Sequence, residues 1–372
     1  MSTITHDIEV SPEPHVPPPT TGKAWHLTWH GVRTVATLEL RQRVRSTRWV
    51  IALVVWFVVV GGITLLTSGS IGFLSGSGIS RLERGPLLFS AVVMLVLGLG
   101  LLVTPTLSST SINGDRNAGT LATLQVTLLS PAEIVVGKLL ASWAASLAFL
   151  AASLPFMLLA LAMGGTPVLS FVLVLLLVSA LLLCVCAVGL GFSALVARTA
   201  GSTVLTFLTV AAVTIIAPIL FVVSLAAVTT PGEFRVWTSE SDGYDAADEC
   251  RWETVTEVRT HTELTWWLLA ANPLVVVADG AGIQDAATSN DPLSGIRTGV
   301  RYLRAGPAAE EDRCWSALSD VASPVDTPDP DATPVWPWGL GVNVLLGAAG
   351  VVTAVRRLHV PQRKLARGTR VA

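Results

Sequence analysis

The chain has 372 residues, of which 51% are apolar and only 13% are charged. Soluble domains usually carry about 25% charged residues, so this composition excludes a water-soluble globule and, for most of the chain, intrinsic disorder. The net charge of −2 gives no reason to expect a nucleic-acid partner.

Two polar segments precede the first apolar run. Residues 1–22 contain five prolines and are expected to form a disordered tail. Residues 23–48 contain six Lys and Arg residues and end in a basic amphipathic segment at 36–48.

Long stretches without charge predict six membrane spans. Between residues 49 and 112 only Arg81, Glu83 and Arg84 are charged, and between 139 and 228 only Arg198. A bilayer core of about 30 Å needs about 20 helical residues to cross it. The predicted spans are residues 49–67, 86–107, 139–163, 168–196, 203–228 and 337–355.

The distribution of Lys and Arg predicts the orientation of these spans. The segment before the first span and the tail 356–372 are both basic, and the loops after spans two and four carry Arg116, Lys138 and Arg198. Basic loops stay in the cytoplasm. We therefore expect both termini inside, in a multi-pass protein of the plasma (inner) membrane.

The loop 229–336 is expected to lie outside, because it holds 19 acidic and 7 basic residues, a net charge of −12. Within it, residues 264–278 form an apolar segment of only 15 residues, which is short for a membrane span. Asn272-Pro273 interrupts this segment. A seventh span here would move the basic tail outside. We interpret the segment as a re-entrant or interfacial pair of short helices, with Trp266 and Trp267 at headgroup level.

The cysteines and two of the histidines are candidates for disulfide bonds or metal ligands. Cys250 and Cys314 lie in the outer loop, where a disulfide can form if they approach, which the sequence leaves open. Cys184 and Cys186 would point to nearly opposite faces of span four. His26-x-x-x-His30 would share a helix face, but no third ligand is near, so no metal site is expected.

The spans lack the groups that several membrane functions need. Their interiors contain no Asp, Glu, Lys, Arg or His, which argues against an ion-coupled transporter, an intramembrane protease and a voltage sensor. The chain also has no phosphate-binding loop: the nearest match, Gly137-Lys138, has Leu139 after it and Ala132 in place of the first glycine. Any energy for transport must come from another subunit.

The stretch between spans two and three has a pattern of its own. Asn113-Gly114 marks a turn, and Leu121, Leu124 and Leu128 follow at helical spacing. Ser130-Pro131 with Glu133 then predicts a capped helix start that runs through Lys138 into span three. The sequence predicts a short helix across the membrane face, a sharp corner and a span.

This stretch resembles the coupling-helix region of the permeases of type-2 ABC exporters. In that family an acidic–Arg pair is followed by Gly-Thr-Leu, a leucine-rich turn, a Ser and a Lys that enters the third span. The chain departs from the pattern at Asn117 and Leu128, where the family usually has Glu and Pro. Residues 36–48 resemble the family's connecting helix, and the broken apolar segment resembles its re-entrant outer helices. The matching positions are Asp115, Arg116, Gly119, Thr120, Leu121, Ser130, Glu133, Gly137 and Lys138.

The resemblance implies the fold class: an all-α integral membrane protein of six transmembrane helices, with a connecting helix, a coupling helix at 115–128 and a large outer loop. It also implies an ABC ATPase subunit as partner, a second permease copy or a paralogous permease, and contact with membrane lipids. ATP and Mg belong to the ATPase, and no cofactor or catalytic residue is expected in this chain. The residues expected to couple the two subunits are Asp115, Arg116, Gly119, Thr120, Leu121, Leu124, Ser130, Pro131, Glu133 and Lys138.

Five threonines in spans two and five are candidates for lining a substrate path. Intramembrane threonines more often bond to their own helix or a neighbour, so both interpretations stay open. The cargo would be amphiphilic, drug-like, lipid-like or a polysaccharide. The alternative is a non-transporting multi-pass protein whose outer loop binds a partner or senses a signal. The threonines are Thr104, Thr203, Thr206, Thr209 and Thr214.

Overall fold

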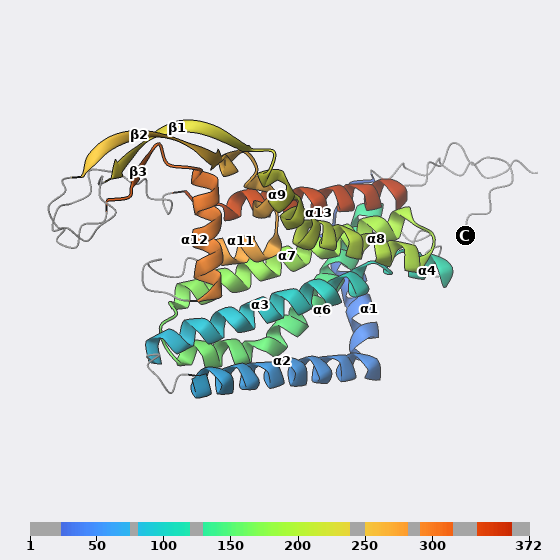
Figure 1. The fold of residues 1–372 in the computed structure, drawn as a ribbon. Helices are drawn as coiled ribbons and strands as arrows, with labels where there is room; N and C mark the ends of the chain where they lie inside the picture. The colour runs from blue at the N-terminus through green and yellow to red at the C-terminus, as the bar shows by residue number, and fades with distance from the viewer. Residues whose placement is uncertain are drawn as a thin grey trace, which may run out of the picture.

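The computed structural model describes residues 24–74, 81–119, 129–238, 250–281, 291–314 and 333–358. Most of these residues are helical (Figure 1). The expected disordered tail 1–22 and most of the basic tail 356–372 lie outside them. The helices are α1 (Trp29–Val44), α2 (Thr47–Leu74), α3 (Arg81–Ser108), α4 (Asn113–Asn117), α6 (Pro131–Ala162), α7 (Val168–Leu195), α8 (Thr199–Ala211), α9 (Ala217–Leu225), α10 (Trp267–Ala270), α11 (Pro273–Gly280), α12 (Pro292–Ala305) and α13 (Trp336–Leu358).

Six helical segments in the described residues are long and apolar enough to cross a membrane, and they confirm the six predicted spans. They are α2, the continuous α3–α4 segment, α6, α7, the continuous α8–α9 segment and α13. The third spanning helix, α6, begins at Pro131 rather than at residue 139, because Ser130 caps the helix before the apolar run starts. The membrane part is therefore helical throughout, as an all-α prediction requires.

Helices α3, α6 and α7 form the core with α13, and small residues let them approach closely. Gly191 of α7 faces Gly350 of α13, and a Cβ on Gly191 would lie 2.6 Å from the Gly350 Cα atom. The small residues Ser142, Ala145 and Ser146 of α6 are all buried. Without water to drive association, such close backbone contact is what holds membrane helices together.

Span five is interrupted close to its proline, Pro218. A π-helical turn, η2 (Ala212–Ile216), joins α8 to α9 just before Pro218. Pro218 has no N–H to donate to the Thr214 carbonyl four residues earlier. Instead the Asn272 side chain, from the broken apolar segment, donates to that carbonyl over 3.1 Å.

The same Asn272 explains why the apolar segment 264–278 is broken. Its side chain oxygen accepts from the Leu274 N–H (2.9 Å) and caps α11, with Pro273 in the first helical position. The segment consists of two short helices, α10 and α11, as the sequence predicts. Asn343 of α13 donates to the Ala271 carbonyl (3.0 Å). Spans five and six are therefore both hydrogen-bonded to the junction between α10 and α11.

A three-stranded sheet, which the sequence analysis did not predict, follows span five. Strands β1 (Thr229–Thr238) and β2 (Arg251–Thr260) pair antiparallel, and β3 (Glu310–Asp312) pairs parallel with β1. Figure 1 places the sheet at the opposite end of the molecule from α4. The all-α prediction is therefore incomplete for the outer loop, because the strands are mostly polar and the apolar alternation of β1 is limited to residues 233–236.

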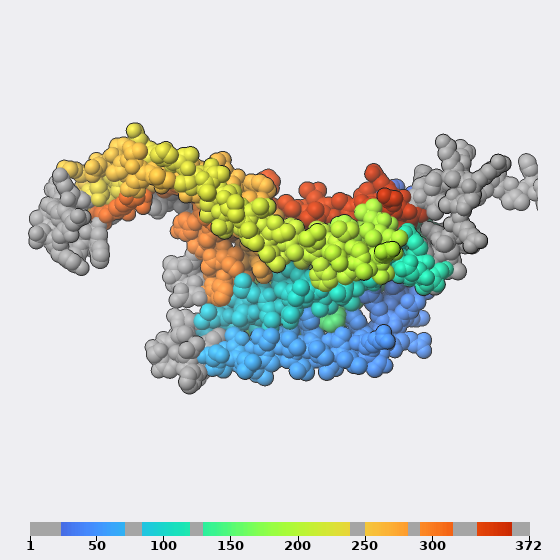
Figure 2. All heavy atoms as spheres, turned by 45° about the vertical axis from the view of Figure 1, so that its right-hand side comes forward, coloured from blue at the N-terminus to red at the C-terminus, as the bar shows by residue number. Residues whose placement is uncertain are grey.

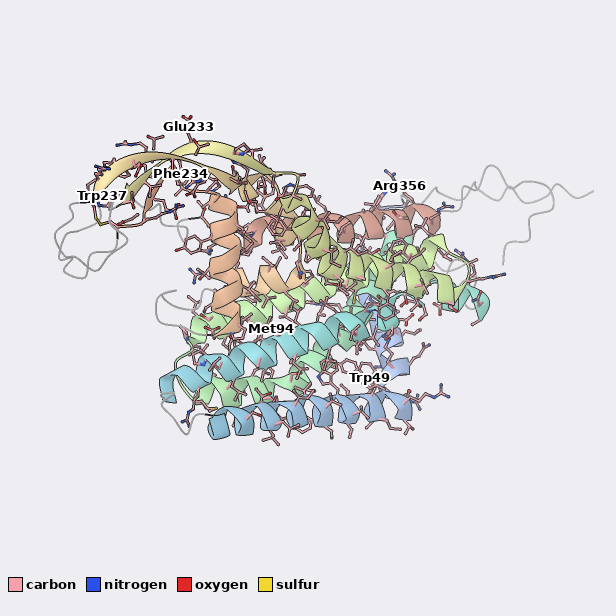
Figure 3. The ribbon with its side chains drawn as sticks, in the orientation of Figure 1. Trp49, Met94, Glu233, Phe234, Trp237 and Arg356 are labelled. Carbon is pink, nitrogen blue, oxygen red and sulfur yellow. A yellow bond between two sulfur atoms is a disulfide. The ribbon has the colours of Figure 1, made fainter. Side chains whose placement is uncertain are left out.

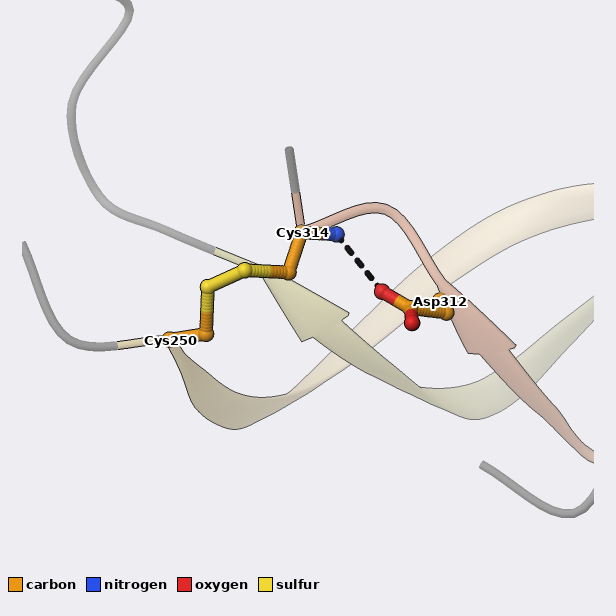
Figure 4. The surroundings of a disulfide bond; sticks show 3 residues. All are labelled: Cys250, Asp312 and Cys314. Atoms are coloured by element: carbon orange, nitrogen blue, oxygen red, sulfur yellow. Dashed lines mark hydrogen bonds between the residues drawn. A yellow bond between two sulfur atoms is a disulfide. The ribbon is translucent and has the colours of Figure 1, made fainter. Parts of the chain in front are cut away.

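Cys250 and Cys314 are joined by a disulfide, with Cα atoms 6.0 Å apart (Figure 4). Cys250 immediately precedes β2, and Cys314 follows β3. Asp312 accepts a hydrogen bond from the Cys314 N–H over 2.9 Å. The bridge ties the two edge strands of the sheet together at one end.

Replacing Cys250 with Ser should loosen this sheet. Removing a native disulfide typically costs about 2–4 kcal/mol. We expect faster protease cleavage within residues 229–314 and an unchanged membrane domain. Mass spectrometry of the unreduced wild-type protein should find the Cys250 and Cys314 peptides joined. Separate peptides before reduction would contradict the pairing.

One buried carboxylate holds the outer helices to span six. Asp279 of α11 is 1% exposed, and its oxygens accept from the Arg301 Nε of α12 (2.5 Å) and from the N–H groups of Val335 (2.6 Å) and Trp336 (2.7 Å). The last two N–H groups lie at the start of α13, where helices leave donors unsatisfied. The Asp279 side chain thus joins α11, α12 and the start of α13.

Candidate functional site

The predicted coupling residues that the structure describes gather at the end of the bundle opposite the sheet. α1, α4 and the N-terminal end of α6 meet there, and α13 ends there (Figure 1). Figure 3 labels Arg356 of α13 and Trp49 of α2 at this end, and Glu233, Phe234 and Trp237 of β1 at the other. The segments predicted to share one side of the membrane therefore share one end of the molecule.

The corner before span three has the predicted capping box. The Ser130 hydroxyl accepts from the Glu133 N–H (3.1 Å), and the Glu133 carboxylate accepts from the Ser130 N–H (2.7 Å). Pro131 occupies the first turn of α6. Each partner satisfies a donor that the helix end would otherwise leave open, which makes this corner rigid.

Glu133 also holds the start of α1, a role that the sequence analysis missed. Its second oxygen accepts from the Thr28 N–H (2.8 Å) and from the Thr28 hydroxyl. The Ser130 hydroxyl in turn donates to the His26 carbonyl. Glu133 is 3% exposed, so it acts inside the protein rather than at its surface. His26 and His30 do not share a helix face, because α1 begins at Trp29.

Close packing continues along the contact of α1 with α6. A Cβ on Gly137 would lie 2.6 Å from the Val35 Cβ and 3.0 Å from the Val32 carbonyl oxygen of α1. Only a residue without a side chain allows this approach. Gly137, one of the positions that resemble the family pattern, is required by the packing of these two helices.

Gly137→Ala should therefore destabilise the protein, although alanine normally favours a helix over glycine. Overpacking of a filled contact costs about 1–3 kcal/mol, which would lower the thermal midpoint in detergent. Gly62→Ala in α2 is the matched control, because a Cβ there meets no described atom within 4 Å. An equal midpoint for both variants would contradict the α1–α6 contact.

Lys138 is the centre of a buried three-residue ion cluster. It is 1% exposed, and its ammonium contacts the carboxylates of Glu39 in α1 and Asp115 in α4, the latter at 2.5 Å. Glu39 and Asp115 have side chains 15% and 29% exposed. The lysine thus joins the amphipathic N-terminal helix, the connection after span two and span three. The family resemblance implies that Asp115 and Lys138 belong to one site, but it gives no reason to include Glu39.

A neutral hydrogen-bond network holds the other side of α4. The Ser193 hydroxyl of α7 accepts from the N–H groups of Ile112 (2.9 Å) and Asn113 (3.1 Å). The Asn113 amide donates to Ser202 of α8 over 2.7 Å. The connection after span two is therefore fixed to the turn between spans four and five as well as to Lys138.

The outermost described residues of the site are Arg116 and Gly119. Arg116 is half-buried, and its side chain has no hydrogen bond or ion pair with a described residue. Gly119 has φ +73°, a left-handed conformation that costs other residues about 1–2 kcal/mol. Thr120, Leu121 and Leu124, and the helix predicted from them, lie outside the described residues. α4 is a short helix that ends at Asn117.

The candidate path-lining threonines bond mostly to backbone of their own helix. Thr203, Thr206, Thr209 and Thr214 each donate to a carbonyl four residues earlier, over 2.7–3.0 Å. Thr104 is 1% exposed and lies 3.3 Å from the Ser146 hydroxyl of α6. Within one chain, these hydrogen bonds are typical of helix packing. A substrate path between two chains would be lined by surfaces that a single chain does not define.

No cluster of three or more His, Cys, Asp or Glu side chains within the described ranges could hold a metal ion. The four cysteines divide into the Cys250–Cys314 pair and two buried free thiols, Cys184 and Cys186.

Comparison with known proteins bears on the first five spanning helices. A family model described as "ABC-2 family transporter protein" matches residues 33–275. The match covers more than half of the chain and includes α4, the corner at Ser130 and the broken segment up to α11. A search of curated proteins gives no match.

Proposed function

The chain belongs to the ABC-2 transporter family, and from this we propose that it is the permease of an exporter driven by a separate ATPase subunit. The observation that carries the proposal is the placement of α4 and the Ser130 corner at one end of six spanning helices. A family transporter without a phosphate-binding loop needs a partner that hydrolyses ATP. ATP and Mg would be held by that partner and supply the energy for transport.

The proposed orientation places α1, α4 and the C-terminal end of α13 in the cytoplasm, and the sheet outside. Basic residues support it, since Arg41, Arg43, Arg45 and Arg48 cluster near the start of span one and Arg356 and Arg357 end span six. The disulfide in the sheet also suits an oxidising compartment. The protein would be a multi-pass protein of the plasma (inner) membrane.

In the proposed mechanism, the ATPase binds α4 and the residues that follow it, and movement passes inward through the buried cluster. A push on α4 reaches Lys138 through Asp115, and Lys138 lies in the first two turns of span three. α1 is carried with it through Glu39 and Glu133. Rigid elements with fixed contacts transmit such a displacement better than a solvated loop does.

A second permease copy or a paralogous permease would complete the transporter. α2 and the α8–α9 segment support this, because only 22% and 11% of their most apolar windows are buried within the chain. These two spans have the most surface left for lipid or another subunit. The proposed cargo is amphiphilic, drug-like, lipid-like or a polysaccharide, with Thr104, Thr203, Thr206, Thr209 and Thr214 as candidates for its path.

Arg116→Ala tests the proposed contact with the ATPase. The variant should stay in the membrane, while ATP-driven export falls about tenfold or more, since coupling free energies typically correspond to about 5–150-fold effects. Export of a fluorescent amphiphile from cells, with ATP hydrolysis by the co-purified complex, gives both quantities. Arg45→Ala is the control, since Arg45 is exposed at the same end but outside α4. Wild-type export by Arg116→Ala would count against the proposal.

A further inference from the structure

A groove of about 760 Å³ opens between α2 and α3 at the end of the bundle where α1 lies. In Figure 2 it is the hollow between the blue α2 and the cyan α3, with part of α6 visible behind it. Phe149 of α6 contributes to its floor, and valine, leucine and tryptophan side chains of α2 and α3 form most of its walls. Its volume lies within the range of about 300–1,000 Å³ typical of small-molecule sites.

The depth of the groove matches one leaflet of a bilayer. Its lining on α2 runs from Arg48 to Val59, eleven residues further along, or about 16 Å at about 1.5 Å per residue. Half of a hydrocarbon core of about 30 Å is about 15 Å. The groove therefore begins at the membrane surface and ends near the midplane.

Charge is confined to the surface end of the groove. Arg43, Ser46 and Arg48 line it there. The Arg43 guanidinium is held at the mouth, because one nitrogen donates to the Leu107 carbonyl (2.8 Å) and to the Ser142 hydroxyl (3.3 Å).

The groups facing these arginines leave net positive charge at the mouth. Arg48 is exposed, with no bonded partner within the part of the chain that the structure describes. Burial lowers the pKa of Arg43 from its high ordinary value, and Glu39 opposes this shift. Glu39, the only acidic residue of α1, is itself bonded to Lys138.

We propose that the groove binds an anionic phospholipid from the leaflet on the α1 side. One acyl chain would lie along the apolar walls as far as Val59, and the phosphate would lie beside Arg43 and Arg48. Basic residues at the membrane surface attract anionic headgroups, and an apolar channel one leaflet deep accepts a single chain. The inference goes beyond the proposed function, because it requires only that these helices span a bilayer.

Native mass spectrometry of the full-length protein in mild detergent tests the proposal, with added phosphatidylglycerol or phosphatidylcholine. We expect one phosphatidylglycerol to bind, several-fold more tightly than phosphatidylcholine. Arg48→Gln should weaken its binding about fivefold, as expected for the loss of one basic group near the headgroup. Arg45→Gln removes a neighbouring exposed arginine outside the groove and should have little effect.

A second pair of variants tests the apolar part of the site. Val55 lines the groove and Val54 does not, yet their exposures are nearly equal, at 54% and 56%. Val55→Trp should abolish phosphatidylglycerol binding, and Val54→Trp should leave it unchanged.

Two results would overturn the proposal. Equal weakening by Arg45→Gln and Arg48→Gln would mean general surface attraction rather than a site. A Val55→Trp variant that loses a dimer mass instead of a lipid would identify a second copy as the occupant.

Discussion

Replacing Lys138 with Met is expected to destabilise the protein by about 3–5 kcal/mol, because it removes the buried cation that contacts two carboxylates. Lys138 is 1% exposed and contacts both Glu39 and Asp115. The loss should appear as a lower thermal midpoint in detergent. ATP-driven export should fall to background, since α4 and α1 would lose their common attachment to span three.

A combined variant separates stability from coupling. Adding Glu39→Gln and Asp115→Asn to Lys138→Met removes every charge of the cluster, and such replacement often restores stability. We expect the thermal midpoint to recover and export to stay low. An unchanged midpoint in the single variant, or recovery of export in the triple variant, would contradict the role given to the cluster.

Asp279→Ala should have a comparable effect at the other end of the molecule, again about 3–5 kcal/mol. The change removes the carboxylate that accepts from the buried Arg301 Nε and from the N–H groups of Val335 and Trp336. Hydrogen exchange followed by mass spectrometry should show faster exchange in α11, α12 and the start of α13.

The matched control for Asp279 is an exposed ion pair in the same outer layer. Glu310 and Arg235 are 3.1 Å apart, with side chains 37% and 54% exposed, and such pairs contribute about 1 kcal/mol or less. Glu310→Ala should leave exchange in the three helices near the wild-type rate. Equal effects of the two substitutions would refute the account of Asp279.

The spans and the corner could be predicted because their signals are local. A charge-free run of about 20 residues has few alternatives to a membrane helix, and the Ser130–Glu133 capping box is specified by four consecutive residues. The break at Asn272-Pro273 is local in the same sense. These features needed no knowledge of what lies beside them.

The contacts of the site could not be predicted, because they join residues far apart in the chain. Glu39 lies 99 residues before Lys138, and Thr28 lies 105 residues before Glu133. The structure consequently changes how the predicted residues are understood. Glu133 and Lys138 are buried and hold α1 and α4 in place, while Arg116 is the more accessible side chain.

The sheet could not be predicted for a different reason. β2 reads Arg-Trp-Glu-Thr-Val-Thr-Glu-Val-Arg-Thr, whose β-branched residues favour a strand but whose polar residues occupy both faces. A strand that is exposed on both sides lacks the alternation that identifies one. The Cys250–Cys314 pairing depends on this sheet, and the sequence left it open for the same reason.

Photo-crosslinking in living cells tests the central claim most directly. A photoreactive amino acid at Arg116 should capture a protein that contains a phosphate-binding loop, identified by mass spectrometry of the crosslinked band. The same group at Val258, which is 68% exposed on β2 at the opposite end, should not capture it. Capture of that protein from Val258, or only of lipid from Arg116, would contradict a permease driven through α4.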